Sequence, residues 1–144
     1  MQIVPFEPSH IGQLLNYGGQ EHLVARFGAH DLSDLIRHGH ALTGVADGQI
    51  IACSGLVEAT PYRAVAWALL SRGAPRHFLA IHRAVLSGLR DSGYRRIEAF
   101  VDPRSAAAMR WIALLGFRLE RAYLPYHFPD GAGASAWVLY PKGR

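Results

Sequence analysis

The sequence predicts an α/β fold, classed as α+β in some schemes, with a central sheet of about seven strands flanked by helices. Short apolar segments typical of strands alternate with longer segments in which apolar residues recur at helical spacing, and glycine and proline separate them. The 144 residues, of which 50% are hydrophobic and 18% charged, suffice for one domain with a buried core. We therefore expect a single domain over residues 1–144, in the order β-α-α-β-β-β-α-β-α-β-β.

The N-terminal part is predicted to hold one strand and two helical zones. Residues 1–6, MQIVPF, alternate apolar and polar side chains as a strand does. A short helix is expected from Pro8 and Ser9. A second helical zone covers residues 21–37, where Gly28 and Asp31 indicate a break and a new N-cap.

The middle of the chain is predicted to contain a hairpin, a buried strand and the longest helix. Asp47-Gly48 is a strong turn signal between two strand-like segments. Residues 63–70, RAVAWALL, are almost entirely apolar, so we expect this strand to be central and buried on both faces. After the turn SRGAP, a helix is expected from about Pro75 to Ser92, because one apolar stripe runs along it and Gly93 follows.

The C-terminal third is predicted to add a strand, a helix and a final pair of strands. RRIEAFVD forms the strand, and Asp102 followed by Pro103 then suits the start of a helix that Gly116 ends. FRLERAYLPYHF is expected to be a strand kinked at Pro125, and ASAWVLY the last strand. The apolar faces of these elements predict a core of Trp67, Leu69, Phe78, Ile81, Val85, Ile97, Ile112 and Phe117.

Composition limits the function classes. Fifteen Lys and Arg against eleven Asp and Glu give a net charge of +4, and Lys142 is the only lysine among the fifteen. Arginine suits planar anions such as phosphate, but these residues are dispersed, so nucleic-acid binding is not indicated. The lone Cys53 excludes a disulfide framework and a multi-cysteine zinc site. With neither a signal peptide nor a membrane span in evidence, we expect a cytoplasmic protein without a metal.

Three segments together are similar to a known family. They are the hairpin DGQIIACSG leading into RAVAWALL, the turn from that strand into the long helix ending in LRDSGYRRIEAFVD, and SAAAMRWIALLGFRLE with its Gly-Phe end. In this order they resemble the GCN5-related N-acetyltransferase (GNAT) family over essentially the whole chain. The resemblance implies a mixed, mostly antiparallel sheet and transfer of an acyl group from acetyl-CoA, or a similar thioester, to an amine acceptor. It also implies a splay between the fourth and fifth strands that receives the pantetheine arm.

The resemblance places coenzyme A at two parts of the chain. The turn after the buried strand would bind the pyrophosphate at a helix N-terminus. This chain keeps one of the family's loop glycines and has Pro75, which lacks an N–H, so arginine side chains would replace lost donors. The cofactor-binding residues that follow from the resemblance are Leu69, Leu70, Ser71, Arg72, Gly73, Arg76, His77 and Phe78, with Ser105 and Ala108 on the later helix.

Catalytic residues are harder to assign, because the position of the family's tyrosine acid falls on Ile112, which cannot donate a proton. Tyr123 and Tyr126, with His127 beside them, flank Pro125 in a region that borders the acceptor site in the family. Glu58 lies where the family often places a base or a water-holding carboxylate. Each of these residues also suits an ordinary role in packing or at the solvent-exposed surface, as does Glu98.

Two alternatives to an acyltransferase follow from the same residues. The departures at the loop and at Ile112 suit a GNAT-like protein that has lost catalysis and acts as a binding protein. Some bacteriophage accessory or virion proteins share the strand-turn-helix series without the glycine loop, so the resemblance extends to them. The sequence identifies neither the acceptor nor the oligomeric state, although the final hairpin leaves a sheet edge at which two copies of the chain could pair as a homodimer.

Overall fold

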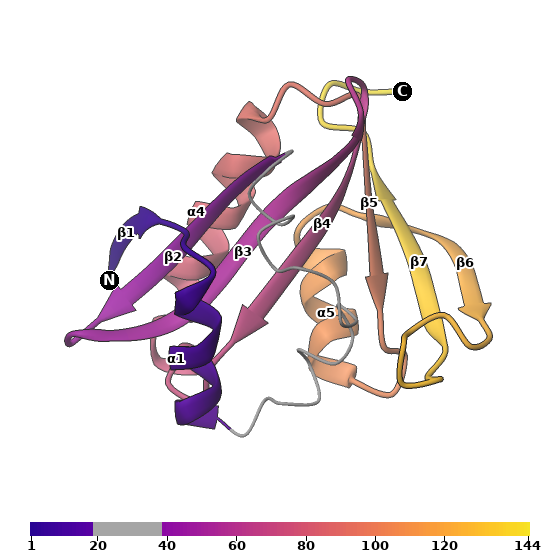
Figure 1. The fold of residues 1–144 in the computed structure, drawn as a ribbon. Helices are drawn as coiled ribbons and strands as arrows, with labels where there is room; N and C mark the ends of the chain where they lie inside the picture. The colour runs from indigo at the N-terminus through magenta and orange to yellow at the C-terminus, as the bar shows by residue number, and fades with distance from the viewer. Residues whose placement is uncertain (19–38) are drawn as a thin grey trace.

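Seven strands form one sheet in the spatial order β1-β2-β3-β4-β5-β7-β6 (Figure 1). This computed structural model describes residues 1–18 and 39–144. Every neighbouring pair of strands is antiparallel except β4 and β5, which are parallel. The elements in chain order are β1 (Gln2–Pro5), α1 (Ser9–Gly18), β2 (Gly39–Ala46), β3 (Gln49–Thr60), β4 (Arg63–Leu70), the 3₁₀ turn η2 (Ala74–His77), α4 (Phe78–Asp91), β5 (Arg96–Val101), α5 (Ala106–Leu114), β6 (Arg118–Leu124) and β7 (Ala134–Leu139).

The predicted sheet and strand order are confirmed. The helical zone expected over residues 21–37, with its break at Gly28 and Asp31, lies outside the described residues. The turn between β2 and β3 is built as the sequence predicts, because Asp47 and Gly48 have φ of 52° and 75°. Positive φ at both central residues defines the turn type whose twist matches that of a two-stranded hairpin.

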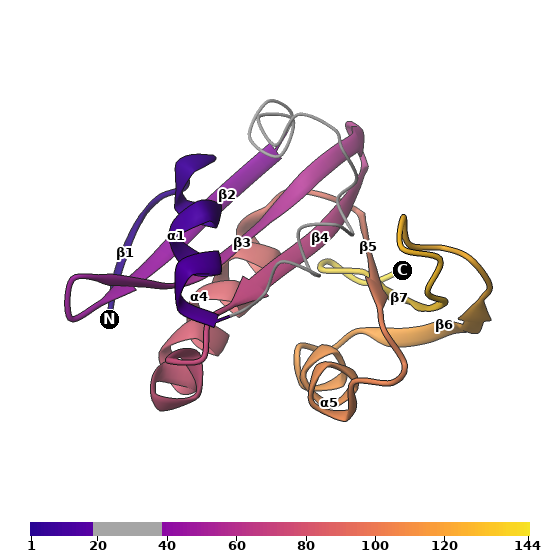
Figure 2. The same ribbon diagram turned by 60° about the horizontal axis from the view of Figure 1, so that its bottom comes forward.

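Helices cover both faces of the sheet (Figure 2). Helix α1 lies on one face, where Ile11 and Leu14 pack with Phe6 and residues of β3 and β4. Helices α4 and α5 lie on the other face, and residues of both enter a core that centres on β4 and β5. The buried members of that core are Leu56, Ala64, Leu89, Tyr94, Ile97, Ala99, Ile112, Leu115 and Phe117.

Two predictions about where helices begin need correction. Helix α4 begins at Phe78 rather than Pro75, because a 3₁₀ turn over Ala74–His77 precedes it. Helix α5 is capped by Ser105, whose hydroxyl accepts a hydrogen bond from the Ala108 amide at 3.2 Å. Asp102 does not cap it, because its carboxylate accepts from the Arg104 amide at 2.9 Å and pairs with the Arg104 guanidinium.

The burial of the predicted core also differs in part. Leu69, Ile81, Ile97, Ile112 and Phe117 are buried, as predicted. Trp67, Phe78 and Val85 are only half-buried. Strand β4 was expected to be covered on both faces, but only Ala64 and Leu69 in it are fully buried. The cause is the way in which β4 meets β5.

Candidate functional site

Strands β4 and β5 pair only at their beginnings and then separate. Their parallel ladder has three residue pairs, the last joining Val65 to Glu98, although β4 runs on to Leu70 and β5 to Val101. Figure 1 shows the two strands diverging from this joint. We call the region between Ala66–Leu70 and Ala99–Val101 the β4–β5 splay. Because β3 pairs with the other edge of β4 throughout, each strand has one backbone edge facing the splay.

The splay explains the unexpected exposure of β4. Ala68 is exposed and Ala66 and Trp67 are half-buried, although β4 is the fourth of seven strands. A central apolar strand that loses its neighbour halfway leaves apolar side chains and unused backbone hydrogen-bonding groups on one side. An extended ligand with amide groups can pair with such an edge as an added strand does.

The loop after β4 uses many of its amides internally. The Gly73 amide donates to the Ser71 hydroxyl at 3.2 Å, and the Ala74 amide donates to the Ser71 carbonyl at 3.1 Å. Pro75 has no amide hydrogen, and the Phe78 amide donates to the Pro75 carbonyl. Gly73 has φ of −78°, which any residue adopts. An anion at this loop would therefore depend on side chains more than on a glycine-built backbone cradle.

Two arginine side chains flank this loop. Arg72 and Arg76 are exposed, and neither forms an ion pair with any residue in the described part of the chain. His77 lies between Arg76 and the start of α4 and is half-buried. Ser71, in contrast, is buried and holds the turn together. Strand β4 and this turn thus bring the expected residues from Leu69 to Phe78 to one end of the splay.

Helix α5 joins this end of the splay from the other side. The indole N–H of Trp111 donates to Nδ1 of His82 at 3.2 Å, and the rings of Trp111 and Phe78 meet edge to face, with centroids 5.7 Å apart. His82 is half-buried and links α4 to α5. Ser105 and Ala108 lie in the first turn of α5, and the Ser105 hydroxyl is already used as the helix cap.

The expected catalytic residues lie apart from one another. Glu58 is on β3 opposite Ala64, near the joint of β4 and β5, and it accepts a hydrogen bond from the Tyr94 hydroxyl at 2.9 Å. Tyr123 is on β6, which β5 and β7 separate from β4, and its ring lies against Gly133. Tyr126 follows β6 with φ of 54° and is 85% exposed. In the described structure these three residues thus lie on separate parts of the fold: on β3, on β6 and in the turn after β6.

His127 has a closer connection to the splay than either tyrosine. Its imidazole stacks on Phe100 of β5, with ring centroids 4.3 Å apart. Phe100 belongs to the part of β5 that has separated from β4. The sequence placed His127 beside Pro125 but gave no reason to prefer it, because the turn that returns this residue to β5 is a tertiary feature.

Other reactive groups have structural roles. Burial raises the pKa of the Cys53 thiol to about 11, even though a hydrogen bond with Thr43 opposes that shift. A thiol of this kind stays protonated and is a poor nucleophile. No cluster of three or more His, Cys, Asp or Glu suited to a metal ion occurs within residues 1–18 and 39–144. Among the same residues, no helix is long and apolar enough to cross a membrane.

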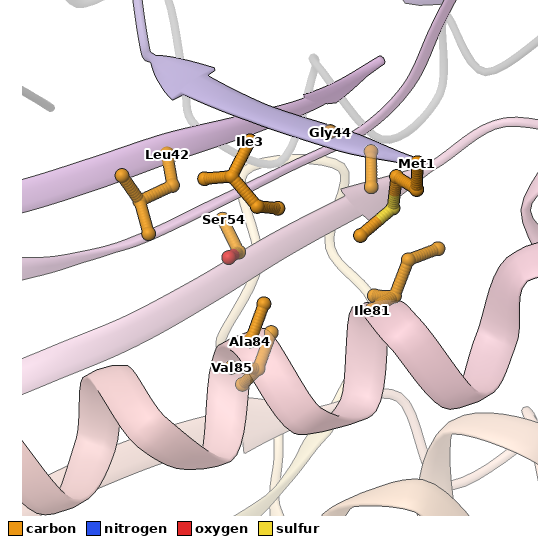
Figure 3. A pocket seen from close by; sticks show the side chains of 9 residues that line it. Met1, Ile3, Leu42, Gly44, Ser54, Ile81, Ala84 and Val85 are labelled. Carbon is orange, nitrogen blue, oxygen red and sulfur yellow. The ribbon is translucent and has the colours of Figure 1, made fainter. Parts of the chain in front are cut away.

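A small hollow between the sheet and α4 is unrelated to the splay. Figure 3 shows that side chains from β1, β2, β3 and α4 line it. Ser54 contributes the one hydroxyl of its lining, and the remaining residues there are apolar. Without a charged group or a row of donors, this hollow has no chemistry to orient a reacting molecule.

No model of a known protein family matches this chain, and no curated protein matches it in sequence. Solved structures do. Ard1 from Thermoplasma volcanium has a TM-score of 0.71 at 17% identity, covering 96% of both chains. Mycobacterium smegmatis RimJ in complex with CoA-disulfide also has a TM-score of 0.71, at 16% identity over 96% of this chain and 80% of the other.

A GNAT family acetyltransferase from Elizabethkingia anophelis with acetyl-CoA bound has a TM-score of 0.67. It is 11% identical and covers 96% of this chain and 97% of its own. Together with the seven-stranded sheet and the splay between β4 and β5, these similarities show that this chain has the GNAT fold. The predicted fold is confirmed.

Proposed function

We propose that this protein binds acetyl-CoA, or a similar acyl-CoA thioester, along the β4–β5 splay and transfers the acyl group to an amine. The splay is the observation that carries this proposal, because it gives two strand edges to an extended, amide-bearing ligand. Two structures of the same fold were solved with CoA-disulfide or acetyl-CoA present. Those ligands belong to the other proteins and support the class of ligand proposed here.

The pantetheine arm would lie along Ala66–Leu70, with its amides hydrogen-bonded to the backbone of β4. The phosphates would then lie at the loop after Leu70, where Arg72 and Arg76 each carry a positive charge without an ion-pair partner among the described residues. A charged hydrogen bond to phosphate contributes about 1.5–3 kcal/mol. In this arrangement the thioester lies near the point where β4 and β5 separate.

The reaction needs one proton removed and one supplied. The amine nitrogen attacks the thioester carbonyl carbon and loses a proton, the carbon–sulfur bond breaks, and the departing thiolate takes up a proton. Tyr123, Tyr126 and His127 are the groups we propose as acid, and Glu58 remains a proposed base. Among the first three, His127 is favoured by its contact with Phe100 on the β5 side of the splay.

A second proposal is a GNAT-fold protein that binds a partner without transferring an acyl group. Two observations favour it. Several amides of the loop after β4 are used within the loop, and Ile112 is buried where the family resemblance places a tyrosine acid. The first proposal predicts that the protein consumes acyl-CoA, and the second predicts that it does not. If the splay has also lost the ability to bind coenzyme A, the two proposals differ in coenzyme A binding as well.

Calorimetric titration of the protein with coenzyme A tests the first proposal. We expect one-to-one binding that weakens about tenfold or more when Arg72 or Arg76 is replaced by alanine, since 1.4 kcal/mol corresponds to a factor of ten. Arg90, an exposed arginine in the last turn of α4, provides the matched control, and Arg90→Ala should bind as the wild type does. Absence of binding by the wild-type protein would reject the acyl-CoA proposal.

A further inference from the structure

The joint between β4 and β5 is the weakest backbone connection in the centre of the sheet. It has three residue pairs, whereas β3 and β4 share eight and β5 and β7 share five. Parallel pairing is also slightly less stable per residue than antiparallel pairing. The position of β5 relative to β4 therefore depends on contacts other than the ladder.

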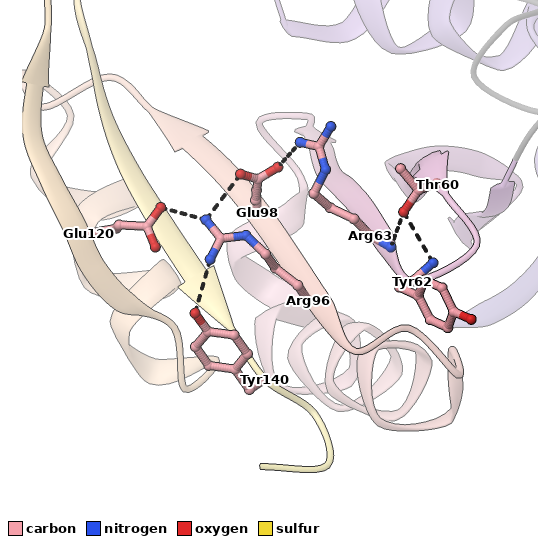
Figure 4. Close-up of polar contacts among 7 residues, drawn as sticks. All are labelled: Thr60, Tyr62, Arg63, Arg96, Glu98, Glu120 and Tyr140. Atoms are coloured by element: carbon pink, nitrogen blue, oxygen red, sulfur yellow. Dashed lines mark hydrogen bonds and ion pairs between the residues drawn. The ribbon is translucent and has the colours of Figure 1, made fainter. Parts of the chain in front are cut away.

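On the face that carries α1, a chain of side chains reinforces the joint (Figure 4). Arg63 of β4 pairs with the Glu98 carboxylate of β5. Glu98 also accepts from Arg96 at 3.2 Å, and Arg96 extends the network to Glu120 of β6 and to the Tyr140 hydroxyl. Among the described residues of this network, only the pair of Arg63 with Glu98 crosses from β4 to β5.

On the opposite face, a second side-chain contact ties the same two parts together. Glu58 of β3 accepts a hydrogen bond from the hydroxyl of Tyr94, which lies just before β5. Tyr94 is 5% exposed and belongs to the core under α4 and α5. Between the two faces, the Tyr62 carbonyl accepts hydrogen bonds from the amides of Arg95 and Arg96 at 2.8 and 3.0 Å. We call the pairs Arg63–Glu98 and Glu58–Tyr94 the joint clamp.

Small rotations at this joint are magnified at the far end of the splay. Beyond Val65, β4 continues for five residues, which is about 16 Å at the usual rise of a strand. A rotation of about 5° at the joint would move the Leu70 end by about 1.4 Å at that length. Misplacement of about 1 Å can cost a reaction roughly 10²-fold in rate.

We propose that the joint clamp sets the width of the β4–β5 splay, and that Arg63, Glu98, Glu58 and Tyr94 are positioning residues for the pantetheine arm. This inference rests on the proposed function, and it gives the two carboxylates a role at the joint. Their geometry supports that role, because each carboxylate already has a partner across the joint.

The binding test compares two ligands that extend differently into the splay. Coenzyme A has the pantetheine arm, whereas adenosine 3′,5′-bisphosphate has only the end that would lie at the loop after β4. Arg63→Gln and Tyr94→Phe each remove one contact across the joint. Glu120→Gln is the matched control, because it breaks an arginine–glutamate contact of the same network without touching the joint.

We expect the Arg63→Gln, Tyr94→Phe double variant to lose at least tenfold in affinity for coenzyme A and less than twofold for the bisphosphate. Glu120→Gln should change neither affinity by more than twofold. Unchanged binding of coenzyme A, or an equal loss for both ligands, would overturn the inference. Failure of the wild-type protein to bind coenzyme A would reject the proposed function instead.

A distance measurement tests the clamp without any ligand. Spin labels at Ala68→Cys and Arg104→Cys, both exposed sites, report the separation between the β4 side and the end of β5, while buried Cys53 stays unlabelled. Pulsed electron spin resonance should show a broader or longer distance distribution in the double variant than in wild type or Glu120→Gln. An unchanged distribution in a folded double variant would overturn the role of the clamp, whether or not coenzyme A binds.

Discussion

Ile112 shows how much a single position depends on its surroundings. The family resemblance assigns a tyrosine acid there, and in this chain the side chain is buried in the core between α5 and the sheet. A hydroxyl at this site would lie among apolar groups, and the larger ring would need space that the core does not offer. The substitution thus agrees with the local packing, and the proton donor for any transfer must lie elsewhere.

Ile112→Tyr should therefore destabilise the protein by about 1–3 kcal/mol, the usual cost of overpacking a core. Urea unfolding followed by circular dichroism measures the difference. Leu114→Tyr, on the same helix at a side chain that is 66% exposed, should stay within about 0.5 kcal/mol of wild type. An Ile112→Tyr protein as stable as wild type would show that the site has room for a phenol, and would reopen it as the place of an acid.

The proton donor can be sought among three neighbouring residues. We expect His127→Asn to lower kcat by roughly 10²-fold or more, the usual contribution of general acid–base catalysis, because His127 contacts the β5 side of the splay. Tyr126→Phe should change kcat little, since Tyr126 is 85% exposed. Tyr123→Phe should lower kcat by an amount between those of the other two variants. Steady-state rates with a panel of amines measure this. Full kcat in all three variants would leave water as the proton donor.

Tyr94 gives the joint clamp a signature in alkaline solution. Burial first, and then the hydrogen bond and negative charge of Glu58, raise the pKa of Tyr94 to about 12 from an ordinary value of 10. Because the folded-state pKa is the higher one, the stabilisation is complete below pH 10 and is lost as the pH rises towards 12.

Unfolding free energies measured between pH 9 and 12 should therefore fall more steeply for wild type than for Tyr94→Phe. The comparison isolates this residue, because the remaining tyrosines and arginines are the same in both proteins. Parallel curves for the two proteins would contradict the assignment of a strongly held, neutral Tyr94 hydroxyl at the joint.

At the scale of elements, the start of α5 shows where the sequence pattern misled us. Asp102 followed by Pro103 has the residues of a helix start, but Asp102 is used by Arg104 and the helix begins three residues later. Ser105→Ala should cost about 1 kcal/mol of stability, the usual value of an N-cap. Ser87→Ala, in the interior of α4, is the control and should change stability by less than about 0.5 kcal/mol, because the Ser87 hydroxyl makes only a long, exposed contact of 3.4 Å with Asp91. An equal effect of the two substitutions would mean that Ser105 is not the cap.

The sequence predicts helix α4 correctly, but it predicts that Phe78, at the N-terminal end of the helix, is buried more deeply than it is. Phe78 is half-buried, with its ring against Trp111 and His82. Phe78→Ala should therefore cost about 1–3 kcal/mol, less than the 3–5 kcal/mol expected of a fully buried ring. Thermal unfolding compared with Ile81→Ala, where the side chain is 3% exposed, tests the order of the two losses. A larger loss at Phe78 than at Ile81 would contradict the burial described here.

For the whole molecule, sequence patterns sufficed to predict the elements and their order but not the splay. The apolar run of β4 predicted burial on both faces, and nothing in RAVAWALL marks Val65 as the residue after which β5 separates. The separation depends on how β1–β4 and β5–β7 are connected at the joint between β4 and β5. Contacts there, such as that of Arg63 with Glu98, join residues 35 positions apart in the sequence. The splay could be expected only from the resemblance to a family.

The candidate site was predictable to a similar degree. Residues Leu69 to Phe78 are consecutive, so any strand-to-helix turn brings them together, and the structure does so. The contact of His127 with Phe100 depends on the path of the β6–β7 turn, and the link between His82 and Trp111 on the packing of α4 against α5. Neither contact leaves a periodic signal in the sequence.

The measurement that tests the central claim most directly is an NMR titration of the ¹⁵N-labelled protein with coenzyme A. If the ligand lies along the β4–β5 splay, the largest amide shifts should fall in Ala66–Phe78 and in Ala99–Ala108, and those of β1, β2 and β6 should stay near their free positions. Spectra unchanged at millimolar coenzyme A, or shifts concentrated around the hollow between β1–β3 and α4, would contradict the account.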